Sequence, residues 1–165
     1  MPHRTLFTEK DFSLDSGFPT LSFAKEADIW LNGIKGKSIT AQLRERKIYK
    51  VKVGVPIPAD GFLVPEGGRF IVEIFYFDSK TSCLTLGHEI AHTFHFDLQS
   101  DPLKSKIPIP RMFEQGKLAS WRIIEKFCDD FSRIWVDLNG GTKKVFSFFE
   151  KNRRFVFIES KILRS

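Results

Sequence analysis

The sequence has little of what marks secreted, membrane-spanning or low-complexity proteins. Two cysteines among 165 residues cannot form a disulfide framework, which favours a reducing compartment. The longest apolar runs, residues 70–77 and 145–149, fall far short of the roughly 20 residues that span a bilayer. The first residues are charged and contain no apolar stretch, unlike a signal peptide. We therefore expect a soluble, cytoplasmic protein that does not bind a membrane.

No internal repeat and no glycine- or serine-rich linker divides the chain, so we expect one domain over residues 1–165. Apolar residues make up 42% and charged residues 28%, which excludes a disordered or collagen-like protein. The net charge is +6, but seven basic and two acidic residues in 141–165 account for +5 of it. The basicity therefore belongs to a divergent, phenylalanine-rich C-terminal tail.

Hydrophobic periodicity predicts an α+β fold with a small antiparallel or mixed sheet packed on helices. Helices are expected at about 21–31, 78–96 and 118–135, and strands at 48–55, 62–64 and 69–77. Two glycines after Pro65 predict a hairpin between the last two strands, and the last strand is apolar on both faces, as expected at the centre of a sheet. Residues 97–119 are expected to form a long loop, and the tail a short hairpin around Asn152.

One motif outweighs all others: His88-Glu89-Ile90-Ala91-His92, an HExxH sequence within the second predicted helix. Residues four apart lie on one face of a helix, so both imidazoles can bind one ion. Zinc takes such nitrogens at roughly 2.0–2.1 Å, and Glu89 would accept a proton from zinc-bound water. The alternative is a pair of ordinary histidines on an amphipathic helix. We predict one Zn²⁺ per chain, bound by His88 and His92.

A catalytic zinc needs a third protein ligand and an open position for water. A metzincin would have histidine six residues after His92, but Leu98 stands there, which excludes that class. His95 and Asp97 are close in sequence, but helical geometry places neither of them well. The helix that carries His88 and His92 therefore offers no good third ligand.

The third predicted helix offers a better one. Glu125 and Asp129 lie four residues apart beside an apolar stripe, where two carboxylates without a cation would be costly. We predict Glu125 as the third zinc ligand and Asp129 as the hydrogen-bond acceptor of a ligand histidine, as in gluzincins. The alternative is a solvated acidic edge. Cys83 and Cys128 are adjacent to the motifs, but small core residues explain them better than thiolate ligands do.

Thr85-Leu-Gly-His-Glu-Ile-Ala-His-Thr-Phe and Ile124-Glu-Lys-Phe-Cys-Asp-Asp-Phe-Ser resemble the two motifs of the ImmA/IrrE family of metallo-endopeptidases. The likeness covers roughly residues 61–135, and two motifs in the right order are far more specific than one. It implies a compact α+β zinc peptidase inside a bacterial cell. The site residues that it implies are the zinc ligands His88, His92 and Glu125 and the general base Glu89.

The resemblance also implies a substrate class, because members of this family typically cleave a helix-turn-helix repressor. We therefore expect an intracellular protein substrate, such as a separate DNA-binding repressor. An oxyanion formed on the scissile carbonyl would need a donor besides zinc, and Tyr76, His95 and Arg111 are candidates among which the sequence does not choose. The family's usual continuation after the second helix is missing, and residues 133–141 lead into the basic tail instead.

Two other functions are compatible with the sequence. The tail interleaves basic residues with phenylalanines, a pattern that could contact phosphates and stack on bases. A strand pair with the phenylalanines inside explains the same pattern better, so direct nucleic-acid binding is not favoured. The altered C-terminus could also leave an inactive remnant that binds zinc and hydrolyses nothing.

Overall fold

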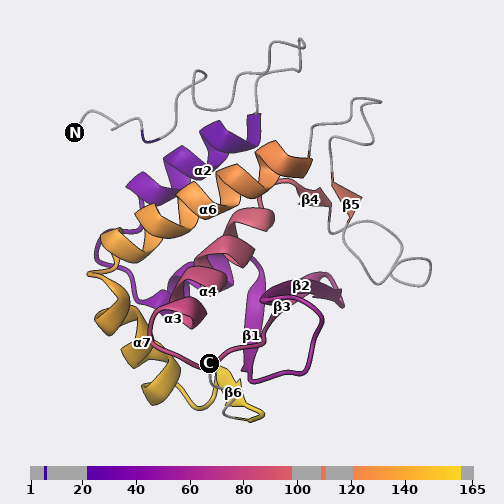
Figure 1. The fold of residues 1–165 in the computed structure, drawn as a ribbon. Coiled ribbons are helices and arrows are strands. Elements are labelled where there is room, and N and C mark those ends of the chain that lie inside the picture. Colours follow the sequence, from indigo (N-terminus) through magenta and orange to yellow (C-terminus); the bar gives the residue numbers. More distant parts are fainter. Residues whose placement is uncertain (1–5, 7–21, 98–108, 111–120, 161–165) are drawn as a thin grey trace.

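The computed structural model describes residue 6 and residues 22–97, 109–110 and 121–160. Its helices are α2 (Ser22–Asn32), α3 (Ile39–Glu45), α4 (Thr81–His92), α6 (Trp121–Leu138) and α7 (Thr142–Lys151). Its strands are β1 (Ile48–Val53), β2 (Gly61–Glu66), β3 (Arg69–Ile74), β4 (Phe96–Asp97), β5 (Ile109–Pro110) and β6 (Val156–Ile158). Helices pack against one mixed sheet (Figure 1), so the predicted α+β class is confirmed.

The main sheet has the strand order β2-β3-β1-β6. β3 pairs antiparallel with β2 and parallel with β1, and β1 pairs parallel with β6. Gly67 and Gly68 both have positive φ and form the tight β2–β3 turn, which confirms the predicted hairpin. β3 lies inside the sheet and buries Ile71 and Val72, neighbours that point to opposite faces. The sequence therefore identified the central strand correctly.

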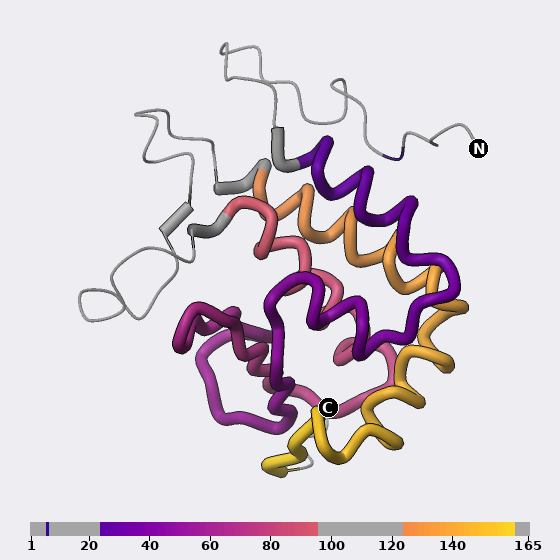
Figure 2. Tube along the Cα trace, turned by 180° about the vertical axis from the view of Figure 1, so that it is seen from behind, coloured from indigo at the N-terminus to yellow at the C-terminus, as the bar shows by residue number. Residues whose placement is uncertain are grey.

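α4 lies between the sheet and α6, and it contacts β2, β3 and α6. From behind, α2 and α6 run side by side (Figure 2). Gly87 lies at a close approach between α4 and α6: a Cβ atom there would lie 2.8 Å from Ser132 Oγ and 2.9 Å from Ser132 Cα. Because Gly87 precedes His88 in the chain, this tight packing fixes the HExxH segment against α6.

α4 ends at His92, earlier than the predicted end near residue 96. The backbone N–H groups of Phe94 and His95 donate to carbonyls three residues back, which tightens the chain after the helix. Arg46 stabilises this turn, since its guanidinium stacks 3.6 Å from the Phe94 ring centre and donates to Thr93 Oγ1 at 2.9 Å. The prediction was wrong here because the contact comes from a residue 47 positions earlier.

The tail also differs from the prediction: the expected hairpin around Asn152 is wrong, and the chain forms α7 followed by β6. Val145, Phe148 and Phe149 are buried at helical spacing, which favours a helix over a strand. β6 adds to the sheet beside β1 instead of pairing with a neighbour in sequence.

Short β4 and β5 pair within the segment predicted as loop, and α3, which Ser38 caps, was not predicted. Among the described residues no helix is both long and apolar enough to cross a membrane.

Candidate metal centre

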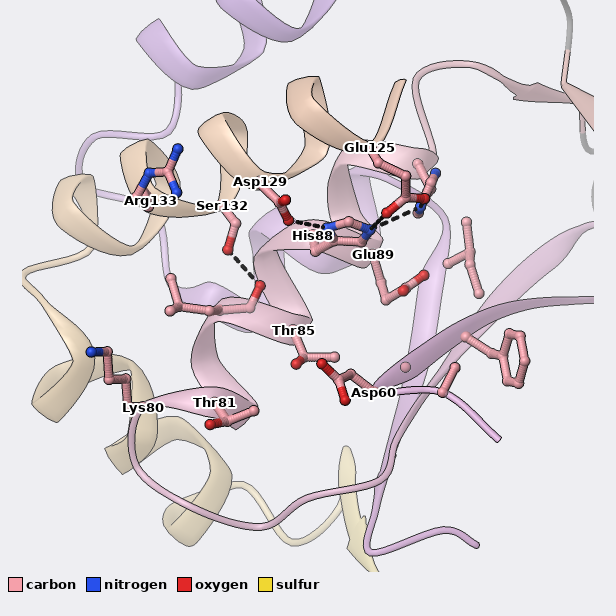
Figure 3. A pocket seen from close by; sticks show the side chains of 16 residues that line it. Asp60, Lys80, Thr81, Thr85, His88, Glu89, Glu125, Asp129, Ser132 and Arg133 are labelled. Atoms are coloured by element: carbon pink, nitrogen blue, oxygen red, sulfur yellow. Dashed lines mark hydrogen bonds and ion pairs between the residues drawn. The ribbon is translucent and has the colours of Figure 1, made fainter. Parts of the chain in front are cut away.

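α4 and α6 bring two imidazoles and one carboxylate together at one end of a cavity (Figure 3). The Nε2 atoms of His88 and His92 are 3.2 Å apart. The carboxylate oxygens of Glu125 lie 3.0 Å from His88 Nε2 and 3.5 Å from His92 Nε2. Tetrahedral zinc with ligands at roughly 2.0–2.1 Å separates neighbouring donors by about 3.3–3.4 Å. The three side chains therefore fit a zinc ion in their present positions.

Asp129 contacts the opposite side of the His88 ring, where its Oδ1 lies 2.8 Å from His88 Nδ1. A carboxylate at Nδ1 favours the tautomer that carries its proton there, which leaves the Nε2 lone pair for a metal. Asp129 thus lies one turn after Glu125 on α6, beside the first of the two predicted ligand histidines. The sequence predicted the type of contact and not which histidine would make it.

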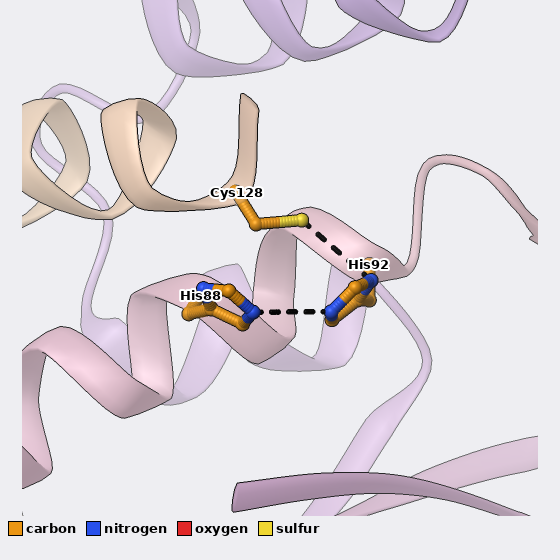
Figure 4. Close-up of side chains that lie close together, drawn as sticks. All are labelled: His88, His92 and Cys128. Carbon is orange, nitrogen blue, oxygen red and sulfur yellow. Dashed lines mark hydrogen bonds between the residues drawn. The ribbon is translucent and has the colours of Figure 1, made fainter. Parts of the chain in front are cut away.

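His92 has a different neighbourhood. Its Nδ1 lies 2.7 Å from His95 Nε2 and 3.6 Å from Cys128 Sγ (Figure 4 draws the contact with Cys128). His95 is completely buried behind His92 and does not line the cavity, so it is not placed to donate to an oxyanion. Tyr76 does not line the cavity either, and Arg111 lies outside the described residues. The side chain of Asp97 also lies outside what the structure describes.

Glu89 is buried, with 5% of its surface exposed, and lines the same cavity. Burial raises the pKa of its carboxyl, while His92 and His88 act in the opposite direction. Gly61, the first residue of β2, leaves room for this carboxylate, because a Cβ atom there would lie 3.3 Å from Glu89 Oε1. A carboxylate with a raised pKa beside an ion site is suited to accept a proton.

Cys128 is a second candidate for the third ligand, since its sulfur lies within 4.8 Å of a ring nitrogen of each histidine. Two observations favour Glu125 instead. The sulfur contacts His92 at Nδ1, whereas His88 and Glu125 face Nε2. Burial raises the pKa of the Cys128 thiol well above its ordinary value, and a protonated thiol is a poor ligand.

The cavity has a volume of about 820 Å³ and extends from the histidines along α4, α6 and β2 (Figure 3). The sequence analysis assigned no role to several residues of its wall, because no local spacing rule places them at the site. These residues are Ala59, Asp60, Gly61, Phe62, Leu63, Lys80, Thr81, Leu84, Ser132 and Arg133. The predicted β2–β3 hairpin indicated that β2 exists, but it did not indicate which end of β2 faces α4 and lines the cavity.

The protonation of the metal-free site leads to a testable pH dependence. Burial alone would lower the pKa of His88, but its hydrogen bond to Glu125 and the charges of Glu89 and Glu125 raise it to about 9. Burial would likewise raise the pKa of Glu125, but hydrogen bonds to both histidines hold it far below its usual range. The raised pKa favours a protonated His88 at neutral pH in the metal-free protein, and a zinc ion bound at Nε2 would have to displace that proton.

We expect zinc affinity to rise about tenfold per pH unit between about pH 7 and about pH 8.5, below the raised pKa of His88. The stability that this proton gives the metal-free protein is present below the ordinary histidine pKa of 6.5 and is lost as the pH rises through about 9. Titration calorimetry in buffers of different ionisation enthalpy counts the protons released, and about one per zinc is expected at about pH 7. An affinity that does not change over this range would contradict the assignment.

Comparisons of this chain with family models, with curated proteins and with solved structures found no match. The resemblance to the ImmA/IrrE family therefore depends on the two motifs alone. The geometry of the site provides the independent argument for function.

Proposed function

We propose that this protein is a zinc-dependent endopeptidase of the cytoplasm, with one zinc held by His88, His92 and Glu125. The observation that carries the proposal is that the two histidine Nε2 atoms lie 3.2 Å apart, beside the buried carboxylate of Glu89, and that the two Glu125 oxygens lie 3.0 Å from His88 Nε2 and 3.5 Å from His92 Nε2. Two histidines and a carboxylate with an adjacent general base are the set that zinc peptidases use. The resemblance to ImmA/IrrE metallo-endopeptidases supports the same reaction class.

In the proposed peptide hydrolysis, the residues of the site have separate roles. Bound zinc would supply a Lewis acid that acidifies a water molecule and polarises the scissile carbonyl. Glu89 accepts the proton of the attacking water and passes it to the leaving amine. Asp129 keeps the His88 ring oriented, and the packing of α4 on α6 holds the three ligand side chains in register.

The position of β2 supports a peptide as the substrate. Within the described sheet β2 is an edge strand, and Gly61, Phe62 and Leu63 of this strand line the cavity. An extended peptide can pair with the backbone of an edge strand, which would present its scissile bond to α4. This placement supports a protein substrate, and the family resemblance supports a separate helix-turn-helix repressor.

Zinc content and peptide cleavage test the proposal together. We expect about one zinc per chain in the purified protein by elemental analysis, and cleavage of a proteome-derived peptide library detected by mass spectrometry. Chelation should abolish cleavage, and added zinc should restore it. A His92→Ala variant provides the control without metal. Zinc without any cleavage would favour an inactive remnant, and a zinc-free protein after reconstitution would overturn the metal site.

A further inference from the structure

A row of alternating cations and aromatic rings crosses three neighbouring strands of the sheet. The Arg69 guanidinium lies 4.2 Å from the centre of the Tyr49 ring. Lys50 Nζ lies 5.8 Å from the same ring and 4.9 Å from the Phe157 ring. These residues belong to β3, β1 and β6, which are adjacent in the sheet (Figure 1). Phe157 is 40% exposed, so its ring is accessible to a ligand.

β1, β3 and β6 run parallel and therefore begin toward the same edge of the sheet. Cations in the residues that precede these strands lie toward that edge. Arg44, at the end of α3, lies 6.0 Å from the ring centre of Phe155, the residue before β6. We call the surface formed by Tyr49, Lys50, Lys52, Arg69 and Phe157 the basic aromatic face. Its three cations make seven together with Arg44, Lys47, Arg153 and Arg154, which precede β1 or β6 in the chain. Within the described part of the chain, none of the seven forms an ion pair.

The charges of this face are unbalanced. Four carboxylates, Glu45, Glu66, Glu73 and Glu159, share these segments or the adjoining strand β2, against the seven cations. An excess of unpaired cations beside the exposed ring of Phe157 is complementary to a polyanion that carries planar groups.

We propose that the basic aromatic face binds single-stranded nucleic acid. Lysine and arginine side chains contact the phosphates, and the rings of Phe157 and Tyr49 stack on bases. A single strand fits better than a duplex, whose bases are already stacked on one another and do not offer their faces. None of the residues of this face lines the cavity that contains His88 and Glu89, so the inference is independent of the proposed peptidase function.

The sequence of the tail favoured a structural role over nucleic-acid binding. Two structural observations now support binding. Phe148, Phe149 and Phe155 are buried in the core, as a structural role predicts, but Phe157 is not. The partners of Phe157 come from outside the tail, from β1, where Lys52 lies opposite it and Lys50 Nζ lies 4.9 Å from its ring centre. The nucleic-acid site is therefore assembled from segments that are about a hundred positions apart in the chain.

Fluorescence anisotropy with labelled oligonucleotides tests this inference. The probes are oligo-dT and oligo-U of about 16 nucleotides, which separate DNA from RNA preference. We expect binding at low salt that weakens steeply as salt is raised. Phe157→Ala should weaken binding about tenfold, and Phe157→Leu, which keeps an apolar side chain without the flat ring, should weaken it similarly. Lys50→Glu should weaken binding and reduce its dependence on salt.

Lys25→Glu is the matched control, because it makes the same change in net charge on the exposed surface of α2. It should bind nearly as the unaltered protein does, and circular dichroism verifies that each variant is folded. The proposal is overturned if neither oligonucleotide binds at low salt, or if Lys25→Glu and Lys50→Glu weaken binding equally. It is also overturned if both Phe157 variants bind unchanged, or if anionic lipid vesicles bind and the oligonucleotides do not.

Discussion

Replacing Glu89 by glutamine is expected to reduce peptide cleavage by about 10²- to 10⁴-fold while zinc stays bound. The amide has the size of the carboxylate and fits the same buried place beside Gly61, but it cannot accept a proton from water. Glu89 is not among the three donors that face one another, so the metal affinity should change little. Steady-state kinetics on a cleaved peptide and elemental analysis of the same preparation measure the two effects.

Glu150→Gln makes the same chemical change on the exposed surface of α7 and serves as the control. Its kcat/KM should equal that of the unaltered protein. If Glu89→Gln retained full activity, Glu89 would not be the general base. If it lost its zinc, the loss of activity would say nothing about proton transfer, and the carboxylate would have to be considered as a ligand.

Replacing Glu125 and Cys128 separately by alanine distinguishes the two candidates for the third zinc ligand. Glu125→Ala is expected to lower zinc affinity by more than about 100-fold, beyond the effect typical of residues that only support a ligand. Cys128→Ala should change it by less than about tenfold, since the thiol lies behind His92 and keeps its proton. Competition with a chelator of known affinity measures both variants.

Cobalt provides a spectroscopic check on the same assignment. Co²⁺ bound by two imidazoles and a carboxylate lacks the charge-transfer absorption that a thiolate ligand produces. We expect no such band in the cobalt-loaded protein. A thiolate band that disappears in Cys128→Ala, together with normal affinity in Glu125→Ala, would reverse the assignment.

The sequence determined much of the fold through local patterns. The spacing of His88 and His92 depends only on the helical repeat, and the paired glycines of the β2–β3 turn depend only on backbone sterics. The buried stripe of α6 likewise follows from periodicity within a single helix. Features of this kind need no partner from elsewhere in the chain, so they can be predicted from the order of residues.

Tertiary structure decided what depends on distant residues. The end of the tail forms β6 because β1, about a hundred positions earlier, offers an edge for parallel pairing. α4 ends at His92 where Arg46 stacks on Phe94, and no local pattern encodes that contact. In the same way, the sequence supplied the chemical types of the candidate metal centre, and the packing of α4 on α6 decided that Asp129 contacts His88. The sequence by itself determined which groups could act together, because helical and strand spacing are local. Only the fold determined which atoms meet, because those distances depend on packing between elements far apart in the chain.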